Sequence, residues 1–166
     1  TRLQGDWSSD VCSSDLKEPN YIQLLELDKE TNQISRIHHN GVAGSLKYSH
    51  GSTNLLASKS SNGDIYIFDF LSEQNSLNSK PFKTLKGQTD SISSLSWNKS
   101  KASLLLSGSL NKQILIWDIN TQSEESTNIL YPLKTYNTNC EVRAVSWNTQ
   151  RSSLFAACGG SGLITM

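Results

Sequence analysis

The sequence has little charge and no long apolar run. Of its 166 residues 18% are charged, and 15 basic residues balance 15 acidic ones. Lys and Arg are scattered rather than clustered, so we expect no direct binding to nucleic acid. No apolar run approaches the roughly 20 residues that cross a bilayer, and no charged, apolar and small-residue leader is recognisable. The sequence therefore predicts neither a membrane protein nor a secreted one.

Cysteine is also scarce, and the three present are too irregularly spaced for a disulfide framework or a zinc site. We expect Cys140 and Cys158 to be reduced and to lie within strands. The glycine-rich residues 159–162 lack the Lys-Ser/Thr pair of a phosphate-binding loop and precede a strand, so a hairpin turn is the better interpretation. No nucleophile, acid–base pair or metal cage is recognisable. The sequence predicts no enzyme, no cofactor, no metal ion and no small-molecule substrate.

What the chain does contain is a repeat of aromatic anchors. Tyr48 is followed after 20 residues by Phe68, and Trp97 after the same interval by Trp117. Trp147 begins a third round. Tyr48 and Trp97 lie 49 residues apart, and Trp97 and Trp147 lie 50 apart. A fixed period of this size is typical of one small sheet unit repeated, in which each copy buries a face against the next. Such repeats favour binding over catalysis.

Each round predicts four strands joined by polar turns. A strand that ends in the aromatic anchor is followed by a polar turn, a small-residue strand, a tight turn and a β-branched strand. The tight turns fall at residues 62–63, 111–112 and 161–162, where Asn and Gly tolerate the positive φ of two-residue hairpins. No helical periodicity of useful length intervenes. The pattern predicts an all-β fold of four-stranded antiparallel blades, a β-propeller.

The first sixteen residues show no kinship to this repeat. Residues 6–16 read DWSSDVCSSDL, which has no periodicity and looks like a sequencing adapter translated in frame. A natural Ser/Asp-rich tail is the alternative. We expect residues 1–16 to be a non-native, adapter-derived segment and exclude them from the fold prediction.

The dipeptide Trp117-Asp118, with Phe68-Asp69 as a variant, resembles the signature of the WD40 repeat family. In that family a His, a Ser, an Asp and the Trp form a buried hydrogen-bonded tetrad. The resemblance implies such a role for His39, Ser58 and Asn62 in the first round, although Phe68 has no indole N–H to donate. In the second round it implies Gln88, Ser107 or Ser109, Asn111 and Trp117. The structural blade residues are then His39, Tyr48, Phe68, Asp69, Trp97, Trp117, Asp118 and Trp147.

Longer phrases narrow the resemblance. EPNY at residues 18–21, IHHNG at 37–41, ASKSSNGDIYIFDF at 57–70 and EVRAVSWNTQRSSLF at 141–155 are similar, in this order, to the retinoblastoma-binding, histone-binding WD40 subfamily. The resemblance implies a nuclear, and also cytoplasmic, scaffold subunit of a chromatin assembly, deacetylase, acetyltransferase or Polycomb-type complex. Its implied partners are histones H3 and H4 or other subunits of such a complex.

The subfamily holds the Arg and Lys of a bound peptide with acidic side chains in the loops before each first strand, because charge-assisted hydrogen bonds are strong. Here the expected acidic positions hold Val42, Ser91 and Arg143, and an expected aromatic position holds Ser93. Asp90 and Glu141 lie nearby and could substitute. The partner-binding loops that the resemblance implies contain Val42, Gly44, Asp90, Ser91, Ser93, Glu141 and Arg143.

The repeat also predicts domain boundaries. We expect a strand from a preceding blade within residues 17–36, at 21–27, blades at 37–80 and 81–131, and a truncated blade at 132–166, about three of the seven blades expected for the family. A generic WD40 adaptor of a vesicle coat, peroxisomal import or a ubiquitin ligase is the alternative function, because Val42 and Ser91 are neutral. A propeller enzyme would need acidic side chains converging on the central channel, and none recur at matching positions.

Overall fold

The computed structural model describes residues 20–27, 32–51, 54–69, 80–87, 92–122, 127–160 and 164–165. Within these ranges all regular structure is β-strand, and no helix is present that could cross a membrane. The strands are β1 (Tyr21–Leu27), β2 (Asn32–His38), β3 (Ala43–Tyr48), β4 (Leu55–Ser60), β5 (Ile65–Asp69), β6 (Lys83–Leu85), β7 (Ile92–Trp97), β8 (Leu104–Ser109), β9 (Gln113–Asp118), β10 (Ile129–Leu130), β11 (Lys134–Asn137), β12 (Val142–Trp147), β13 (Phe155–Gly159) and β14 (Ile164–Thr165).

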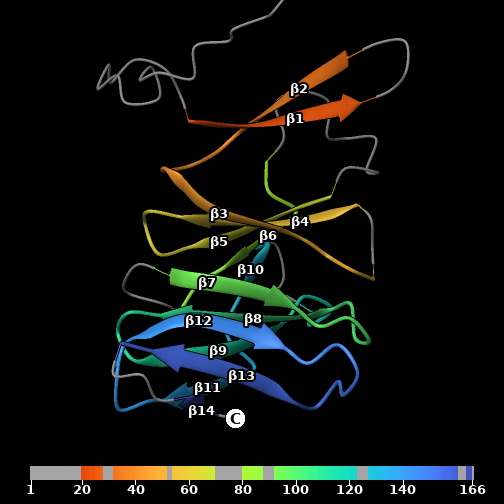
Figure 1. The fold of residues 1–166 in the computed structure, drawn as a ribbon. Helices are drawn as coiled ribbons and strands as arrows, with labels where there is room; N and C mark the ends of the chain where they lie inside the picture. The colour runs from red at the N-terminus through yellow and green to blue at the C-terminus, as the bar shows by residue number, and fades with distance from the viewer. Residues whose placement is uncertain are drawn as a thin grey trace, which may run out of the picture.

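The strands form four sheets that are stacked in chain order (Figure 1). Sheet A is the hairpin β1-β2. Sheet B has the order β10-β6-β5-β4-β3, sheet C the order β11-β9-β8-β7, and sheet D the order β12-β13-β14. Neighbouring strands pair antiparallel except β10, which runs parallel to β6. The all-β fold of antiparallel blades predicted from the sequence is confirmed.

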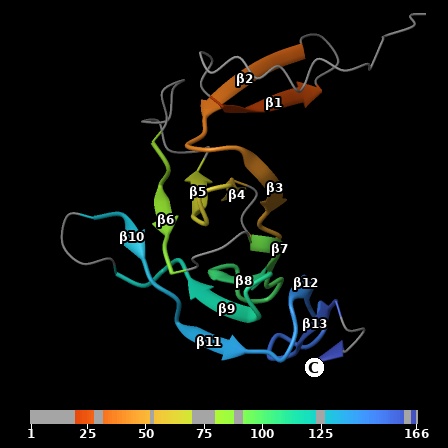
Figure 2. The same cartoon turned by 90° about the vertical axis from the view of Figure 1, so that its left-hand side faces the viewer.

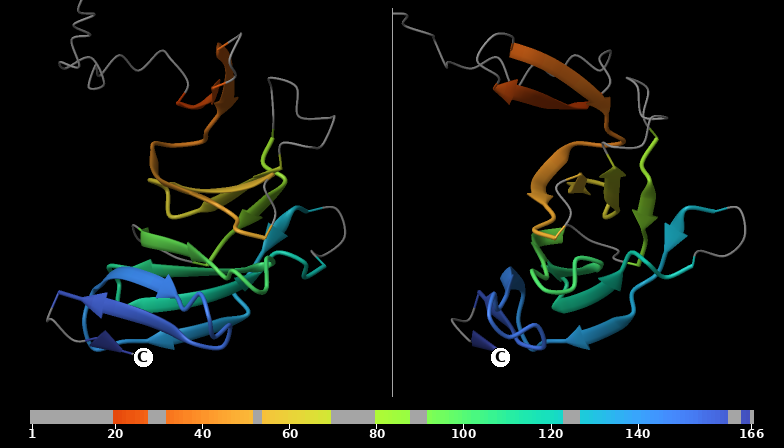
Figure 3. Two further views of the ribbon diagram at one scale, coloured as in Figure 1. Left: turned by 45° about the vertical axis from the view of Figure 1, so that its right-hand side comes forward. Right: turned by 90° about the vertical axis from the view of Figure 1, so that its right-hand side faces the viewer.

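The first strands of the sheets share one side of the molecule. Figure 2 shows β3, β7 and β12 one below another, with β6, β10 and β11 on the opposite side. The views in Figure 3 show the same arrangement from two other directions. Sheets B, C and D therefore stand like consecutive propeller blades, whose first strands line the centre and whose last strands form the rim.

The chain ties neighbouring blades together at the rim. β6 comes directly before β7 of sheet C in the sequence, yet it pairs with β5 of sheet B. β10 extends sheet B beyond β6. β11 follows β10 after residues 131–133 and pairs with β9 of sheet C. Adjacent sheets are thus joined by covalent chain at their outer edges as well as by packing.

Apolar side chains fill the spaces between the sheets. One cluster joins sheets B and C and contains Ile67, Trp97 and Trp117. A second joins sheets C and D around Ile116 and Trp147. A third joins the sheet A hairpin to sheet B; its members are Ile22, Ile37, Leu56, Tyr66 and Phe68, with Leu24 and Ala43 packed against them. Each sheet buries a face against the next, as the repeat predicted.

Hydrogen bonds reinforce the contact between sheets C and D. The backbone N–H of Val145 donates to Ser94 Oγ at 3.3 Å, and that of Trp147 donates to Ser96 Oγ at 3.0 Å. β8 has a glycine at this contact. A Cβ on Gly108 would lie 2.7 Å from Val142 Cγ1 and 2.9 Å from Val145 Cγ1, inside van der Waals contact. β12 therefore packs directly against the β8 backbone.

The turns that follow β7 and β12 meet on the side of the stacked sheets where these strands end. Asn98 is fully buried, and its Oδ1 accepts from the N–H of Ser100 at 3.0 Å and of Lys101 at 2.9 Å. Its Nδ2 donates across to the Ser152 carbonyl in the next blade at 2.8 Å. Asn148 makes the same turn in sheet D, accepting from Gln150 and Arg151 at 2.8 Å. These are Asx turns, in which the side chain satisfies backbone donors that the turn leaves open.

The two predicted tight turns that the structure describes each contain one residue with positive φ, but in the second turn that residue is Lys112 and not the expected Asn111. Gly63 adopts φ 86° in the β4-β5 turn, and Lys112 adopts φ 66° in the β8-β9 turn. Lys112 is the only residue other than glycine with positive φ in the described part of the chain. The third turn, at 161–162, lies outside the described residues.

Several details differ from the sequence predictions. Residues 17–36 contain two described strands rather than one, because β1 turns back into β2. The fourth strand of sheet B, β6, lies beyond the predicted blade end at residue 80. Cys158 lies in β13, but Cys140 lies in the bend before β12; both are free thiols. The segment 1–16 lies outside the described residues.

Candidate protein-binding surface

The first two strands of sheets B, C and D pair in the same register. Tyr48 pairs with Leu56, Trp97 with Leu105, and Trp147 with Phe155. In each sheet the register shifts once near the start of the first strand. The residues at the shifts are Gly44, Ser93 and Arg143, each of which has no pairing partner in the ladder.

A β-bulge leaves one residue out of the ladder and redirects its side chain, and bulges are frequent beside binding sites. Three of the seven predicted binding residues, Gly44, Ser93 and Arg143, occupy this bulge. They lie at the same height in three neighbouring blades, at the N-terminal ends of β3, β7 and β12. We call this side of the stacked sheets, where β3, β7 and β12 begin, the bulge end.

The shared register corrects one alignment made from the sequence. Arg143 is equivalent to Gly44 and not, as the sequence comparison predicts, to Val42 and Ser91, because Arg143 lies four residues before Trp147 and Gly44 lies four before Tyr48. Glu141 takes the position equivalent to Val42. The third blade therefore does hold an acid at the expected acidic position. Counting residues back from Tyr48 and Trp147 identifies Glu141 as the equivalent of Val42 from the sequence alone.

The described side chains at the bulge end include charged, polar and apolar groups. Val42 is 61% exposed and Leu110 is 40% exposed, so the bulge end offers apolar contacts as well as charge. Arg143 Nη2 lies 3.9 Å from Glu141 Oε2, and both side chains are exposed. Ser93 Oγ donates to the Val142 carbonyl and thus joins sheets C and D. Asp90 and Ser91 lie outside the described residues.

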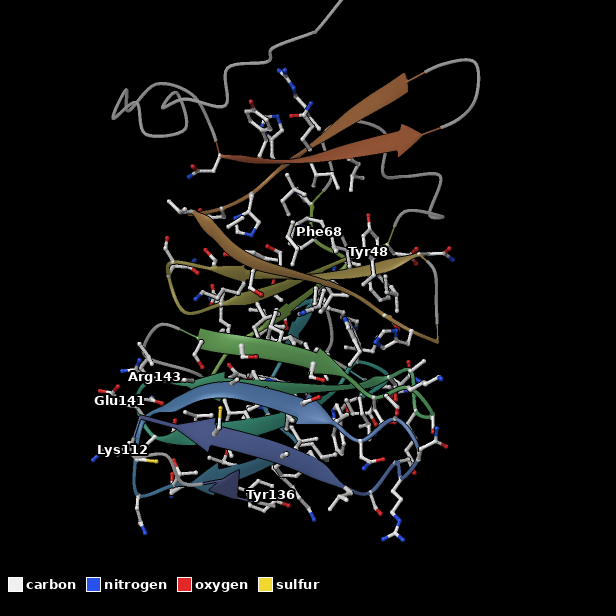
Figure 4. All side chains as sticks on the ribbon, in the orientation of Figure 1. Tyr48, Phe68, Lys112, Tyr136, Glu141 and Arg143 are labelled. Atoms are coloured by element: carbon white, nitrogen blue, oxygen red, sulfur yellow. The ribbon has the colours of Figure 1, made fainter. Side chains whose placement is uncertain are left out.

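Three backbone carbonyls at the bulge end accept hydrogen bonds. The N–H of Thr138 donates to the Lys112 carbonyl at 2.8 Å, and Thr138 Oγ1 donates to the Cys140 carbonyl at 2.7 Å. The N–H of Gly160 donates to the Glu141 carbonyl at 3.1 Å. Figure 4 shows Lys112, Glu141 and Arg143 on the left-hand side of the stacked sheets, whereas Tyr48 lies further to the right. No motif in the sequence predicts that Lys112 lies beside these residues.

The predicted tetrad of the first blade forms only in part. Ser58 Oγ lies 2.7 Å from His39 Nε2, and both residues are buried. His39 Nδ1 donates to the Gly41 carbonyl at 2.7 Å; a neutral ring then accepts at Nε2 from the Ser58 hydroxyl. The predicted role of Asn62 is wrong. Its Nδ2 donates to Tyr66 Oη at 2.9 Å instead, because the Gly41 carbonyl already occupies the ring nitrogen.

The second blade keeps the tryptophan side of the tetrad. Trp117 Nε1 donates to Ser107 Oγ at 2.8 Å, and both residues are buried. This selects Ser107 over Ser109, whose Oγ accepts from the Asn111 backbone N–H at 3.3 Å. Gln88 lies outside the described residues. Ala157 occupies the equivalent position in sheet D, where no hydroxyl is available.

The remaining predicted blade residues differ in their burial and in their position along the strands. Trp97 and Trp147 are buried at 3% and 7% exposure, and Phe68 packs beside His39. Tyr48 is 54% exposed, because β3 is covered less completely than β7 and β12. Asp69 and Asp118 end the third strands, and Asp118 Oδ1 accepts from the Asn120 N–H at 3.0 Å. A turn-capping position of this kind is structural rather than catalytic.

No group of three or more His, Cys, Asp or Glu residues that could hold a metal ion occurs in the described ranges. A hollow of about 290 Å³ lies between the β1-β2 hairpin and sheet B. It is lined by His38, His39, Asn40, Tyr66, Phe68, Lys80 and Pro81. His39 and Tyr66 already use their polar atoms within the fold, so the bulge end is the better candidate for a partner.

Part of the chain matches a protein-family model, and its fold matches a solved structure. Residues 79–118 match the WD40 family, described as WD domain, G-beta repeat. The match runs from β6 to β9, so it takes the last antiparallel strand of sheet B together with the first three strands of sheet C. The β-propeller domain of Cps50 (Swd1) from Myceliophteria thermophila superposes with a TM-score of 0.57 at 20% identity, covering 73% of this chain and 34% of that one. This likeness shows the fold.

Curated relatives are similar over most of the chain. Histone-binding protein MSI1 of Saccharomyces cerevisiae is 30% identical over 158 residues, covering 81% of this chain and 37% of the relative. Histone acetyltransferase type B subunit 2 of Mycosarcoma maydis is 30% identical over 131 residues, covering 76% and 30%. Protein transport protein SEC31 of Saccharomyces cerevisiae is 25% identical over 163 residues, covering 96% and 11%. The chain spans about a third of the length of the first two.

Proposed function

We propose that this WD40-repeat chain is a non-catalytic scaffold that binds histones H3 and H4 as part of a nuclear chromatin complex. Its blade architecture is that of a protein-interaction scaffold. The observation that carries the histone assignment is the 30% identity to a histone-binding protein over 81% of the chain. The phrases at 37–41, 57–70 and 141–155 support it, because their order matches that of the histone-binding subfamily.

The bulge end is the surface that we assign to the partner. It repeats the same backbone bulge in three blades, so an extended peptide lying across β3, β7 and β12 meets three equivalent positions. Glu141 supplies a carboxylate for a basic side chain, and the exposed Val42 supplies an apolar contact. Arg143 partly neutralises Glu141, so charge alone is a weak source of affinity at this point.

Retention of histones on the immobilised chain tests the proposal. We expect H3–H4, or an H4 peptide, to be retained at moderate salt above a scrambled peptide. Glu141→Lys should weaken binding about fivefold, because it removes an exposed carboxylate and places a like charge against a basic ligand. Gln150→Lys adds the same side chain in the turn after β12, on the side of the sheets opposite the bulge end, and should leave binding unchanged. Retention equal to that of the scrambled peptide would contradict the assignment of histones as the partner.

A generic adaptor role remains the second candidate, because SEC31, a protein transport protein, matches 96% of the chain. An adaptor of that kind has no reason to prefer a basic peptide. If neither H3–H4 nor the H4 peptide is retained above the scrambled control, the adaptor assignment replaces the histone one while the scaffold fold stands.

A further inference from the structure

The outer strands of sheets B and C begin with nearly the same short sequence. Residues 81–84 read PFKT at the start of β6, and residues 132–135 read PLKT at the start of β11. The pairing of β6 with β5 and of β11 with β9 places Phe82 and Leu133 at equivalent positions in the two sheets. The rim therefore repeats one apolar residue followed by one lysine in neighbouring blades.

Large apolar side chains on this rim are exposed. Phe82 is 43% exposed, Leu133 is 57% exposed and Tyr131 is 70% exposed. Blades pack face to face, whereas these side chains lie at the outer edges of sheets B and C, each of which already packs between two other sheets. β10 lies along the outer edge of β6 at Thr84 and Leu85, yet Phe82 remains exposed. A strand added outside β6 thus leaves the apolar position open.

Hydrogen bonds at both ends hold the crossover at residues 131–133, between β10 and β11. The N–H of Lys86 donates to the Leu130 carbonyl of β10 at 2.9 Å, which fixes the start of the crossover on sheet B. The N–H of Leu133 donates to the Ile116 carbonyl of β9 at 2.8 Å, which fixes its end on sheet C. The crossover is therefore tied to two blades.

The middle of the crossover packs inward. A Cβ on Gly87 would lie 2.9 Å from Pro132 Cδ and 3.6 Å from the Trp117 ring, so Pro132 rests close to the glycine backbone. Gly87 also adopts φ 144°, which glycine tolerates. With Pro132 anchored, Tyr131 and Leu133 are exposed on either side of it. A surface ordered before binding costs a partner little conformational entropy.

Basic side chains lie among these apolar ones. The lysines of the rim are Lys80, Lys83, Lys86 and Lys134. The nitrogen of Lys83 lies 5.6 Å from the centre of the Phe82 ring. The described segments 80–87 and 127–137 contain no acidic residue. These lysines are far apart in the sequence, and the fold gathers them because β6, β10 and β11 lie on one side of the molecule (Figure 2).

We propose that this rim binds an acidic segment of a partner protein in which carboxylates alternate with apolar side chains. The surface, which we call the rim patch, consists of Phe82, Tyr131, Leu133 and the four lysines. Apolar side chains of the partner pack on Tyr131 and Leu133, and its carboxylates pair with Lys86 and Lys134. Exposed apolar groups bordered by polar ones are typical of protein contacts. Leucine offers no ring on which a base could stack, so a polypeptide fits better than a nucleic acid.

A short fluorescein-labelled peptide in which Glu alternates with Leu and Phe is the probe, and fluorescence anisotropy measures its binding to the whole chain. Two further peptides, one with Lys in place of Glu and one with Ser in place of Leu and Phe, separate the two chemistries. We expect only the first peptide to bind. Its affinity should fall as salt is added, because exposed charge pairs are screened.

Two double variants test the two halves of the rim patch. Tyr131→Ser/Leu133→Ser removes the apolar side chains, and Lys86→Glu/Lys134→Glu reverses the charge. Each should weaken binding of the first peptide about tenfold or more, because a few central side chains carry most of a contact's affinity and like charges repel. The four side chains are exposed, so the fold should survive, as circular dichroism can check.

The matched control is Lys99→Glu/Lys101→Glu, which reverses two exposed lysines in the turn after β7 and should leave the affinity unchanged. The rim patch is separate from the bulge end, so the rim variants should retain the H4 peptide fully, and Glu141→Lys should bind the acidic peptide normally. No binding of the acidic peptide would overturn the proposal and leave the lysines only the role of keeping edge strands from pairing. An equal loss in the control variant, or tighter binding of oligouridylate or of phosphatidylserine vesicles, would also overturn it.

Discussion

Replacing Trp117 by alanine is expected to lower the free energy of unfolding by about 4 kcal/mol, the range found for deleting a buried aromatic ring. Trp117 is 1% exposed and lies in the cluster that joins sheets B and C. The substitution also leaves Ser107 Oγ without the indole donor at 2.8 Å. Denaturant unfolding followed by circular dichroism measures the change.

The matched control is Trp117→Phe, which keeps an aromatic ring and removes only the indole N–H and the second ring. Sheet B already carries phenylalanine at this position, Phe68, in a buried site. We expect a loss of about 1–2 kcal/mol, mostly from the missing hydrogen bond. If alanine and phenylalanine cost the same, packing between the blades contributes little, and the account of Trp117 as a core anchor is wrong.

Gly108→Ala is expected to destabilise the chain by about 2–3 kcal/mol through overpacking. Its Cβ would approach Val142 and Val145 to less than 3.0 Å, and neither β8 nor β12 can shift without loss of the hydrogen bonds from Val145 and Trp147. Sheet D should loosen first, so limited proteolysis should cut near residues 138–141 before it cuts within sheets B and C.

Gly160→Ala provides the matched glycine. The atoms nearest to a Cβ there belong to the Arg143 side chain, with Nε at 3.4 Å, which is ordinary contact with a flexible group. We expect a change within about 0.5 kcal/mol, as for surface substitutions generally. Equal effects of the two substitutions would mean that β12 does not rest on the β8 backbone as described.

Periodicity predicted the fold well because each blade repeats one register. The interval from Trp97 to Trp117 determines where β7 and β9 lie across β8. Gly63 explains the turn at 62–63 because glycine tolerates positive φ, whereas in the turn at 111–112 it is Lys112, not Asn111, that adopts positive φ. The parallel pairing of β10 with β6 had no such signal. It depends on where the rim loop crosses between sheets, which two strand residues cannot specify.

The surface was harder to predict than the fold. The family resemblance predicts that Gly44, Ser93 and Arg143 lie in partner-binding loops. A bulge is a property of two paired strands, however, and only the register shows that these three residues share it. Likewise Tyr48 has the sequence of a buried anchor. Its exposure depends on what lies against β3, which no local pattern contains.

The most direct test of the central claim is a titration of the isotopically labelled chain with an H4 peptide, followed by amide chemical shifts. The account predicts shifts concentrated at the bulge end, around Gly44, Ser93, Lys112, Glu141 and Arg143, with little change in the Asx turns at 98–101 and 148–151. Shifts centred on those turns, or no shifts at peptide concentrations that saturate the immobilised chain, would contradict it.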